Sequence, residues 1–263
     1  KANDGIHLNW PRSYSRAGWW AEPGGIEMNK NYEPQTKAIQ DYFDNAFAYL
    51  GSKNDKKDIP YEAMKGLQTG EKTLFVNANG EKEIIDAVLF KKKNNIKNMT
   101  IVGGYYAFKS AKLLKENNVS VLLKRVHDLP LLEDEDVNLP YKNAKLLVDA
   151  GVLVALQNAG DMERMQTRNL PFYAGTCAAW GLTKEQALQL ITGNSAKILG
   201  IDNQYGTLEA GKSATLFISE GDALDMKTNV ISFAFIDGRQ ISLESHHTEL
   251  YERYKGKFEQ QKK

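Results

Sequence analysis

The feature that most constrains the fold is a repeated alternation of short apolar runs with helical stretches between residues 73 and 182. Apolar runs without clean alternation are typical of strands buried on both faces, as in parallel sheets. The pattern predicts four βα units, which suit either a doubly wound sheet or half of a (β/α)8 barrel. The runs are TLFVN (73–77), MTIVGG (99–104), VSVLLKR (119–125) and GVLVALQN (151–158).

Composition and motifs argue against several other classes of protein. The 34 basic and 33 acidic side chains leave a net charge of +1, which favours neither nucleic acid nor an anionic membrane. No run of 18 apolar residues is present, so no membrane span is predicted. The pair Gly103-Gly104 ends a predicted strand without the third glycine of a dinucleotide-binding loop, and no Walker A motif occurs.

The single cysteine excludes a disulfide scaffold within the chain. It is Cys177, and its small neighbours predict a buried thiol. No secretory signal is visible, but the chain opens without an initiator Met, so an exported and a cytoplasmic location both stay open.

The predicted elements divide the chain into three parts: 1–200, 201–245 and 246–263. The first part holds the βα units. Before them, the aromatic and turn-rich stretch 7–25 is predicted to be a loop, and apolar spacing predicts helices over 33–50 and 61–67. Trp10, Trp19 and Trp20 are expected to cluster with Tyr14 at a pocket or across the barrel mouth.

The end of the chain, from residue 183 onward, changes in character. Thr183 with Gln186 forms a capping box at a helix start, Asn194 is predicted to cap the next helix, and Gly200 to close it. Antiparallel strands are expected within 206–221 and 229–243, with a hairpin at Asp237-Gly238. The third part is predicted to be a polar helical tail.

Three motifs in the last third of the chain resemble the amidohydrolase superfamily. They are LTKEQALQLITGNSAKILGI, YGTLEAGKSATLFISEGDAL and FAFIDGRQI, and the subgroup they resemble most is the imidazolonepropionase-like bacterial proteins. The resemblance implies the C-terminal half of a TIM-type (β/α)8 barrel with strands of a small accessory β-sandwich. It also implies that an N-terminal segment, or a partner chain, completes the barrel.

The same resemblance implies a metal-activated water that hydrolyses a C–N bond in a cyclic amide or similar small molecule. The family supplies His-x-His at the first strand, histidines at the ends of strands five and six, and an aspartate at the end of strand eight. Here no His-x-His occurs among His7, His127, His246 and His247. The corresponding strand ends carry Asn77, Gly103-Gly104 and the run Gln157-Asn158-Ala159.

A neutral amide oxygen cannot replace imidazole on zinc. We therefore expect no metal in this chain; zinc or a similar divalent ion is expected only if the site is intact in a full-length protein. The alternative function is a catalytically inactive binding protein, or the structural partner of an active relative.

Polar residues near the predicted strand ends are the remaining candidates for chemistry. Asp161 and His127 are candidate catalytic residues, with Asp128 or Asp161 orienting the imidazole; an ordinary loop carboxylate and a surface histidine are the alternatives. Arg125 and Arg168 are suited to hold a carboxylate, against the alternative of surface ion pairs. The expected partner is a small-molecule ligand, and a homo-oligomer stays open. Further candidate substrate-binding residues are Asn77, Asn79 and Asn158.

Overall fold

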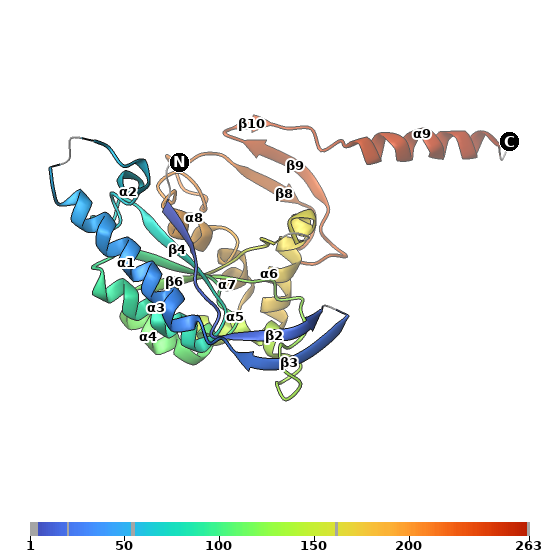
Figure 1. Ribbon diagram of the computed structural model, residues 1–263. Coiled ribbons are helices and arrows are strands. Elements are labelled where there is room, and N and C mark those ends of the chain that lie inside the picture. Colours follow the sequence, from blue (N-terminus) through green and yellow to red (C-terminus); the bar gives the residue numbers. More distant parts are fainter. Residues whose placement is uncertain (1–4, 20, 54–55, 161–162, 262–263) are drawn as a thin grey trace.

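A five-stranded parallel sheet forms the centre of the molecule (Figure 1). The structure is a computed structural model and describes residues 5–19, 21–53, 56–160 and 163–261. Neighbouring strands follow the order β1-β4-β5-β6-β7, and every pairing among them is parallel. The strands are β1 (Gly5–Asn9), β4 (Thr73–Ala78), β5 (Asn98–Gly103), β6 (Val119–Leu123) and β7 (Val154–Leu156).

Helices follow the strands and cover one face of the sheet, where α1, α3 and α4 lie together in Figure 1. β4 shows how the chain divides its side chains: Leu74 and Val76 join the main core, whereas Phe75 packs on the opposite face with Ala155 and Ile198. The helical segments up to the end of β7 are α1 (Tyr32–Leu50), α2 (Ile59–Ala63), α3 (Glu81–Lys93), η1 (Ala107–Ser110), α4 (Ala111–Glu116) and α5 (Leu139–Asp149).

The rest of the chain adds short helices and a small antiparallel sheet. Asp237 and Gly238 have positive φ values of 49° and 78° and form the predicted hairpin turn. Helix α9 (His246–Gln261) extends away from the body (Figure 1). The other elements are η2 (Glu163–Asn169), α6 (Leu170–Ala179), α7 (Lys184–Gln189), α8 (Gly193–Leu199), β8 (Leu216–Ser219), β9 (Ile231–Ile236) and β10 (Arg239–Gln240).

The predicted fold class is confirmed. Consecutive parallel strands with intervening helices form part of an α/β barrel, and a small antiparallel sheet follows them. The four predicted βα units are present, and the capping box of Thr183 and Gln186 forms as expected. Gly200 ends α8 at φ 63°.

The prediction of a loop over residues 7–25 is wrong. This segment contains part of β1 and a hairpin of β2 (Tyr14–Trp19) and β3 (Glu22–Met28). β1 is only five residues long, and it is a strand because it pairs with β4, a contact 68 residues away in sequence. Gly18, with φ 83°, lies within a strand beside an irregular register rather than in an open loop.

Two smaller predictions also need correction. Asn194 does not cap α8: it lies inside the helix, and its Nδ2 donates to the backbone oxygen of Val154 at 2.9 Å. The short helix expected at 61–67 is α2 at Ile59–Ala63, because the Asp58 side chain caps it and accepts from the Tyr61 amide.

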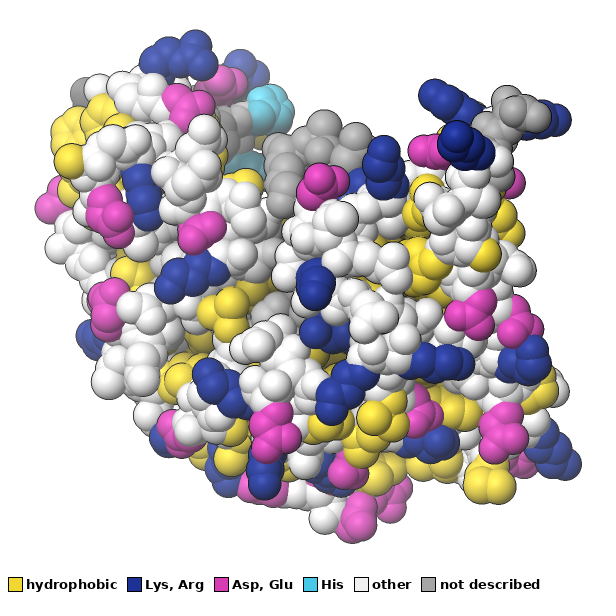
Figure 2. Space-filling model, turned by 90° about the vertical axis from the view of Figure 1, so that its left-hand side faces the viewer, with side chains coloured by type: hydrophobic (Ala, Val, Ile, Leu, Met, Phe, Trp, Pro, Cys, Tyr) yellow, Lys and Arg dark blue, Asp and Glu magenta, His cyan; other side chains and the backbone are white. Residues whose placement is uncertain are grey.

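Surface charge and hydropathy agree with the composition. Figure 2 shows acidic and basic side chains interspersed over one face of the molecule. Among the described residues, no helix is long and apolar enough to cross a membrane. Cys177 is 1% exposed within α6, as predicted.

Candidate functional site

The carboxyl ends of the parallel strands meet at one edge of the sheet, which we call the mouth. At the mouth, Asn9 of β1 lies opposite Asn77 of β4. The Asn77 Nδ2 donates to Asn9 Oδ1 at 2.9 Å, and the Trp10 amide donates to the Asn77 backbone oxygen at 3.1 Å. Asn9 was missed in the sequence because its strand was not recognised; the apolar residues Ile6 and Leu8 beside it were the available signal.

A cavity of about 360 Å³ opens beside this amide pair. Its walls combine amides, cations and aromatic rings: Asn9, Asn77, Asn79, Arg12, Lys124 and Tyr14 line it. Glu83, 3% exposed, also lines the cavity and accepts the Ser13 amide at 2.6 Å. The cavity can therefore offer both donors and acceptors to a polar ligand.

Part of the expected aromatic cluster lies at this cavity, because Trp10 and Tyr14 both line it. Trp10 is buried, donating to the Tyr32 hydroxyl at 3.0 Å. Trp19 is 55% exposed in the hairpin. Trp20 lies outside the described residues.

Glycines at the end of β5 make room for the Asn79 side chain. Gly103 has φ 98°, and a Cβ at that position would lie 2.6 Å from Asn79 Oδ1. The backbone oxygen of Asn79 accepts the Tyr106 amide at 2.9 Å. A larger residue at Gly103 would therefore meet both a steric contact and a strained backbone.

A second, wide cavity of about 700 Å³ lies at the mouth around His127. The His127 Nε2 is 2.6 Å from Thr176 Oγ1, and that hydroxyl donates to the Phe172 backbone oxygen at 3.0 Å. Because the hydroxyl proton is engaged, Nε2 carries the hydrogen of the imidazole. The ring also packs edge-on against Tyr173, with 4.6 Å between the ring centroids.

The surroundings of His127 favour its neutral form. Burial of the ring lowers the pKa of His127, and the nearby Arg125 guanidinium lowers it further. Among the residues that the structure describes, Thr176 orients the imidazole. The predicted Asp128 instead contacts Lys124 at 2.6 Å and Arg125 at 3.8 Å, because the two cations precede it in the same loop.

Arg125 lines this second cavity with Tyr141 and Thr176. Its Nε is buried without a hydrogen-bond partner. Arg168 is exposed in η2, and Asn158 follows β7. Asp161 lies outside the described residues, so its role stays a prediction.

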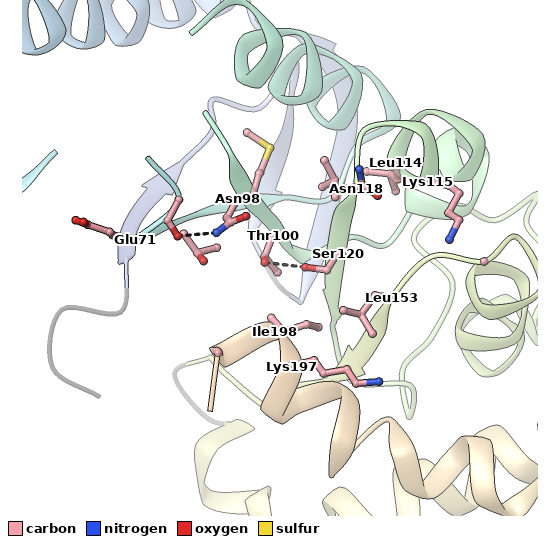
Figure 3. A pocket seen from close by; sticks show the side chains of 16 residues that line it. Glu71, Asn98, Thr100, Leu114, Lys115, Asn118, Ser120, Leu153, Lys197 and Ile198 are labelled. Atoms are coloured by element: carbon pink, nitrogen blue, oxygen red, sulfur yellow. Dashed lines mark hydrogen bonds between the residues drawn. The ribbon is translucent and has the colours of Figure 1, made fainter. Parts of the chain in front are cut away.

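A third cavity, of about 410 Å³, lies at the amino ends of the strands (Figure 3). The Thr100 and Ser120 hydroxyls are 2.8 Å apart on its wall, and the Asn98 amide donates to the Gly70 backbone oxygen at 2.9 Å. Lys115 and Lys197 come from the last turns of α4 and α8. Cations in that position complement the helix dipole.

Comparisons with known proteins agree on the class that this architecture defines, part of a TIM-type (β/α)8 barrel. The crystal structure of an amidohydrolase from Thermotoga maritima MSB8 matches with a TM-score of 0.71 and 22% identity, over 92% of this chain and 63% of that chain. A Xaa-Pro dipeptidase with bound methionine in its active site matches with a TM-score of 0.53 and 17% identity, over 69% of this chain and 48% of that one. A prolidase complexed with N-methylphosphonate-L-proline has a TM-score of 0.51 and 18% identity, with the same coverage.

The sequence profile of the amidohydrolase family matches residues 71–241, from just before β4 to just after β10. The chain belongs to the amidohydrolase family, as the resemblance predicted. It spans less than two thirds of the length of the solved structures above. No curated protein matches it.

Members of this family are generally metal-dependent, so the donor set at the mouth matters. Zinc takes imidazole, thiolate and carboxylate ligands. The described strand ends carry Asn9, Asn77, Gly103 and Gln157, and among the described residues no group of three His, Cys, Asp or Glu side chains could hold a metal. The described residues of this chain therefore do not fit a zinc centre.

Proposed function

We propose that this chain forms the ligand-binding half of a hydrolase that acts on the C–N bond of a small molecule, a cyclic amide or a similar compound. The observation that carries this proposal is the match of an amidohydrolase family profile to the segment that builds most of the mouth. Active sites of such barrels lie at the carboxyl ends of the strands, where two polar cavities lie in this chain.

The substrate is proposed to carry a carboxylate. Arg125 supports this because its buried Nε has no hydrogen-bond partner beside a cavity wide enough for a small ligand, and guanidinium binds carboxylate through paired hydrogen bonds. The ligands named in the two dipeptidase-type structures, methionine and a phosphonate of proline, are amino acid derivatives with this group. Asn9, Asn77 and Asn79 are proposed to bind the amide part.

His127 is proposed as a general acid or base at this mouth. With Nε2–H held by Thr176, its Nδ1 is the basic atom of the neutral ring. Asp161 remains a candidate catalytic residue. The described donors do not fit a metal, so a metal centre would need ligands from additional polypeptide.

The experiment pairs elemental analysis with turnover, using purified full-length protein. Cyclic amides and dipeptides are supplied with and without added zinc, and release of the amine is followed by mass spectrometry. We expect zinc-dependent hydrolysis that falls on Asp161→Ala and on Arg125→Met. Full turnover by metal-free protein would contradict the metal-dependent mechanism.

A second candidate function is a binding protein that retains the barrel without its metal. The specific observation is that the ends of β1, β4 and β5 present an amide pair and a glycine. This candidate predicts that the protein contains no zinc, even after incubation with the ion, and still binds an N-acyl amino acid. Stoichiometric zinc held by residues of this chain would contradict it.

The proposed domain plan assigns residues 1–200 to the barrel, 201–245 to strands of an accessory sandwich and 246–263 to a tail. β1 and β7 are the edge strands of the sheet, and edges of this kind attract further strands. We propose that additional polypeptide, from the same protein or a partner chain, pairs with them to complete the barrel.

A further inference from the structure

The loop that joins β6 to α5, residues 124–138, contributes to both cavities at the mouth. Lys124 and Leu131 line the smaller cavity, and Arg125, His127 and Leu129 line the larger one. The position of this single loop therefore affects the shape of both cavities.

One carboxylate near the end of the loop holds it in place. The Tyr105 hydroxyl donates to Glu135 Oε2 at 2.8 Å, and the Tyr106 hydroxyl donates to Oε1. The amides of Leu131 and Leu132 donate to Oε2 at 2.9 and 3.3 Å. Three of these donors meet Oε2 and one meets Oε1, so both oxygens of the carboxylate are engaged.

The two tyrosines form a fixed support for this carboxylate. They directly follow Gly103-Gly104 at the end of β5 and are 1% and 8% exposed. Their rings pack edge-on at 4.8 Å, and Asn143 of α5 donates to the Tyr105 backbone oxygen at 2.6 Å. The loop is thus bonded through Glu135 to the rigid sheet, whereas Leu129 near its tip is 75% exposed.

We infer that Glu135 is a positioning residue for the mouth: by joining the 124–138 loop to Tyr105 and Tyr106, it places Leu131 and His127 against their cavities. Its functional meaning rests on the proposed use of the mouth as the ligand site. The positioning itself is a property of the free protein and is tested without any ligand.

The test compares Glu135→Ala with the wild-type protein by two measurements. Hydrogen exchange follows the amides of Leu131 and Leu132, which lose their carboxylate acceptor in the variant. Leu131 keeps a bond to the Tyr105 hydroxyl at 3.2 Å, so we expect the Leu132 amide to exchange about tenfold faster or more and the Leu131 amide to accelerate less. Carbethoxylation of His127 by diethylpyrocarbonate, followed by mass spectrometry, reports the cavity. His246, with 79% of its side chain exposed, is the internal reference. The rate for His127 relative to His246 is expected to rise about threefold or more.

Three variants complete the experiment. Asp134→Ala removes the neighbouring exposed carboxylate and should leave both rates unchanged. Glu135→Gln keeps an oxygen acceptor and should restore most of the protection. Tyr106→Phe removes one hydroxyl donor and should give an intermediate effect in a folded protein, should Glu135→Ala fail to fold.

The outcomes separate clearly. Wild-type rates in Glu135→Ala would overturn the inference. Faster hydrogen exchange at Leu131 with an unchanged carbethoxylation rate at His127 would also overturn the inference. The carboxylate would then hold only the turn around residues 131–135. Exchange at Ile101 of β5 that accelerates equally would show a general loss of stability and overturn the positioning role. A failure to find any substrate would bear on the proposed function alone.

Discussion

The two ends of the parallel sheet are built from similar polar residues but are held together differently. At the mouth, side-chain hydrogen bonds join segments far apart in sequence: Asn9 with Asn77, His127 with Thr176, and Glu135 with two tyrosines. At the amino ends, Thr100 bonds Ser120 of the adjacent strand, and Asn98 bonds the backbone oxygen of Gly70, which precedes β4.

This difference indicates a division of roles. The bonds at the amino ends join segments 20 and 28 residues apart and hold adjacent elements together, as expected for the stability face of a barrel. At the mouth, long-range bonds fix cavities whose lining comes from several elements. Substitutions of polar side chains at the amino ends should therefore change stability without changing binding. Substitutions of the exposed amide side chains at the mouth should show the opposite balance, whereas Gly103 has a structural role at the mouth.

The largest effect on stability is expected from Gly103→Ala at the mouth. The positive φ and the contact with Asn79 together should lower the free energy of unfolding by about 2–3 kcal/mol. Gly211→Ala is a matched control: its φ of 92° is similar, but a Cβ there meets no atom within 4 Å. The difference between the two variants in free energy of unfolding, measured by chemical denaturation, gives the steric contribution of Asn79. Equal losses would show that the Asn79 side chain moves aside without cost.

A smaller effect is expected from Thr100→Val at the amino end. The change keeps the volume of a side chain that is 1% exposed and removes the hydroxyl pair with Ser120, at a cost of about 1 kcal/mol. Chemical denaturation of Thr100→Val, Ser120→Ala and the double variant should show that the two losses in free energy of unfolding are not additive. Any change in ligand binding at the mouth would break the proposed division.

Asn77→Ala should change stability by only about 0.5 kcal/mol, since its amide bond to Asn9 is exposed. Binding or turnover of an amide substrate should fall by about tenfold. Asn98→Ala is the corresponding change at the opposite end, because Asn98 also makes one amide bond of 2.9 Å. Steady-state kinetics or calorimetry should separate the two, and equal losses would contradict a ligand role for the mouth amides.

The smallest effect is expected from pH. Burial alone would raise the pKa of Glu135, but hydrogen bonds from Tyr106, Tyr105 and two backbone amides lower it below its usual range. Stability from a depressed carboxyl pKa is present above the unfolded value and is lost as pH falls through the folded one. Burial raises the pKa of both tyrosines, so they keep their protons at neutral pH.

Protection of the Leu131 and Leu132 amides, corrected for intrinsic exchange, should therefore stay constant from about pH 8 to pH 5 and fall only in more acidic solution. The other groups near this carboxylate are Asp128, which acts on Tyr105, and Tyr14, which acts on Tyr106. A loss of protection centred near pH 6 would instead implicate His127.

The sequence predicted the barrel units because Ile101 and its neighbours form continuous apolar runs, a local property. It predicted the caps at Thr183 and Gly200 for the same reason. β1 escaped prediction because its partner, β4, lies 68 residues further on. Three other features were not predicted for the same reason: the role of Asn9, the contact of Thr176 with His127, and the contacts of Glu135. Each depends on a long-range contact that no local pattern encodes.

Cys177 offers a practical use that follows from its position. It is the only thiol of the chain, it is 1% exposed, and burial raises its pKa to about 12. A thiol reagent at neutral pH should thus react only as fast as α6 opens. The rate at which Cys177 is labelled in the wild-type protein therefore reports the rate at which α6 opens. A cysteine introduced at an exposed site such as Leu129 could be labelled with a reporter dye while Cys177 stays unmodified.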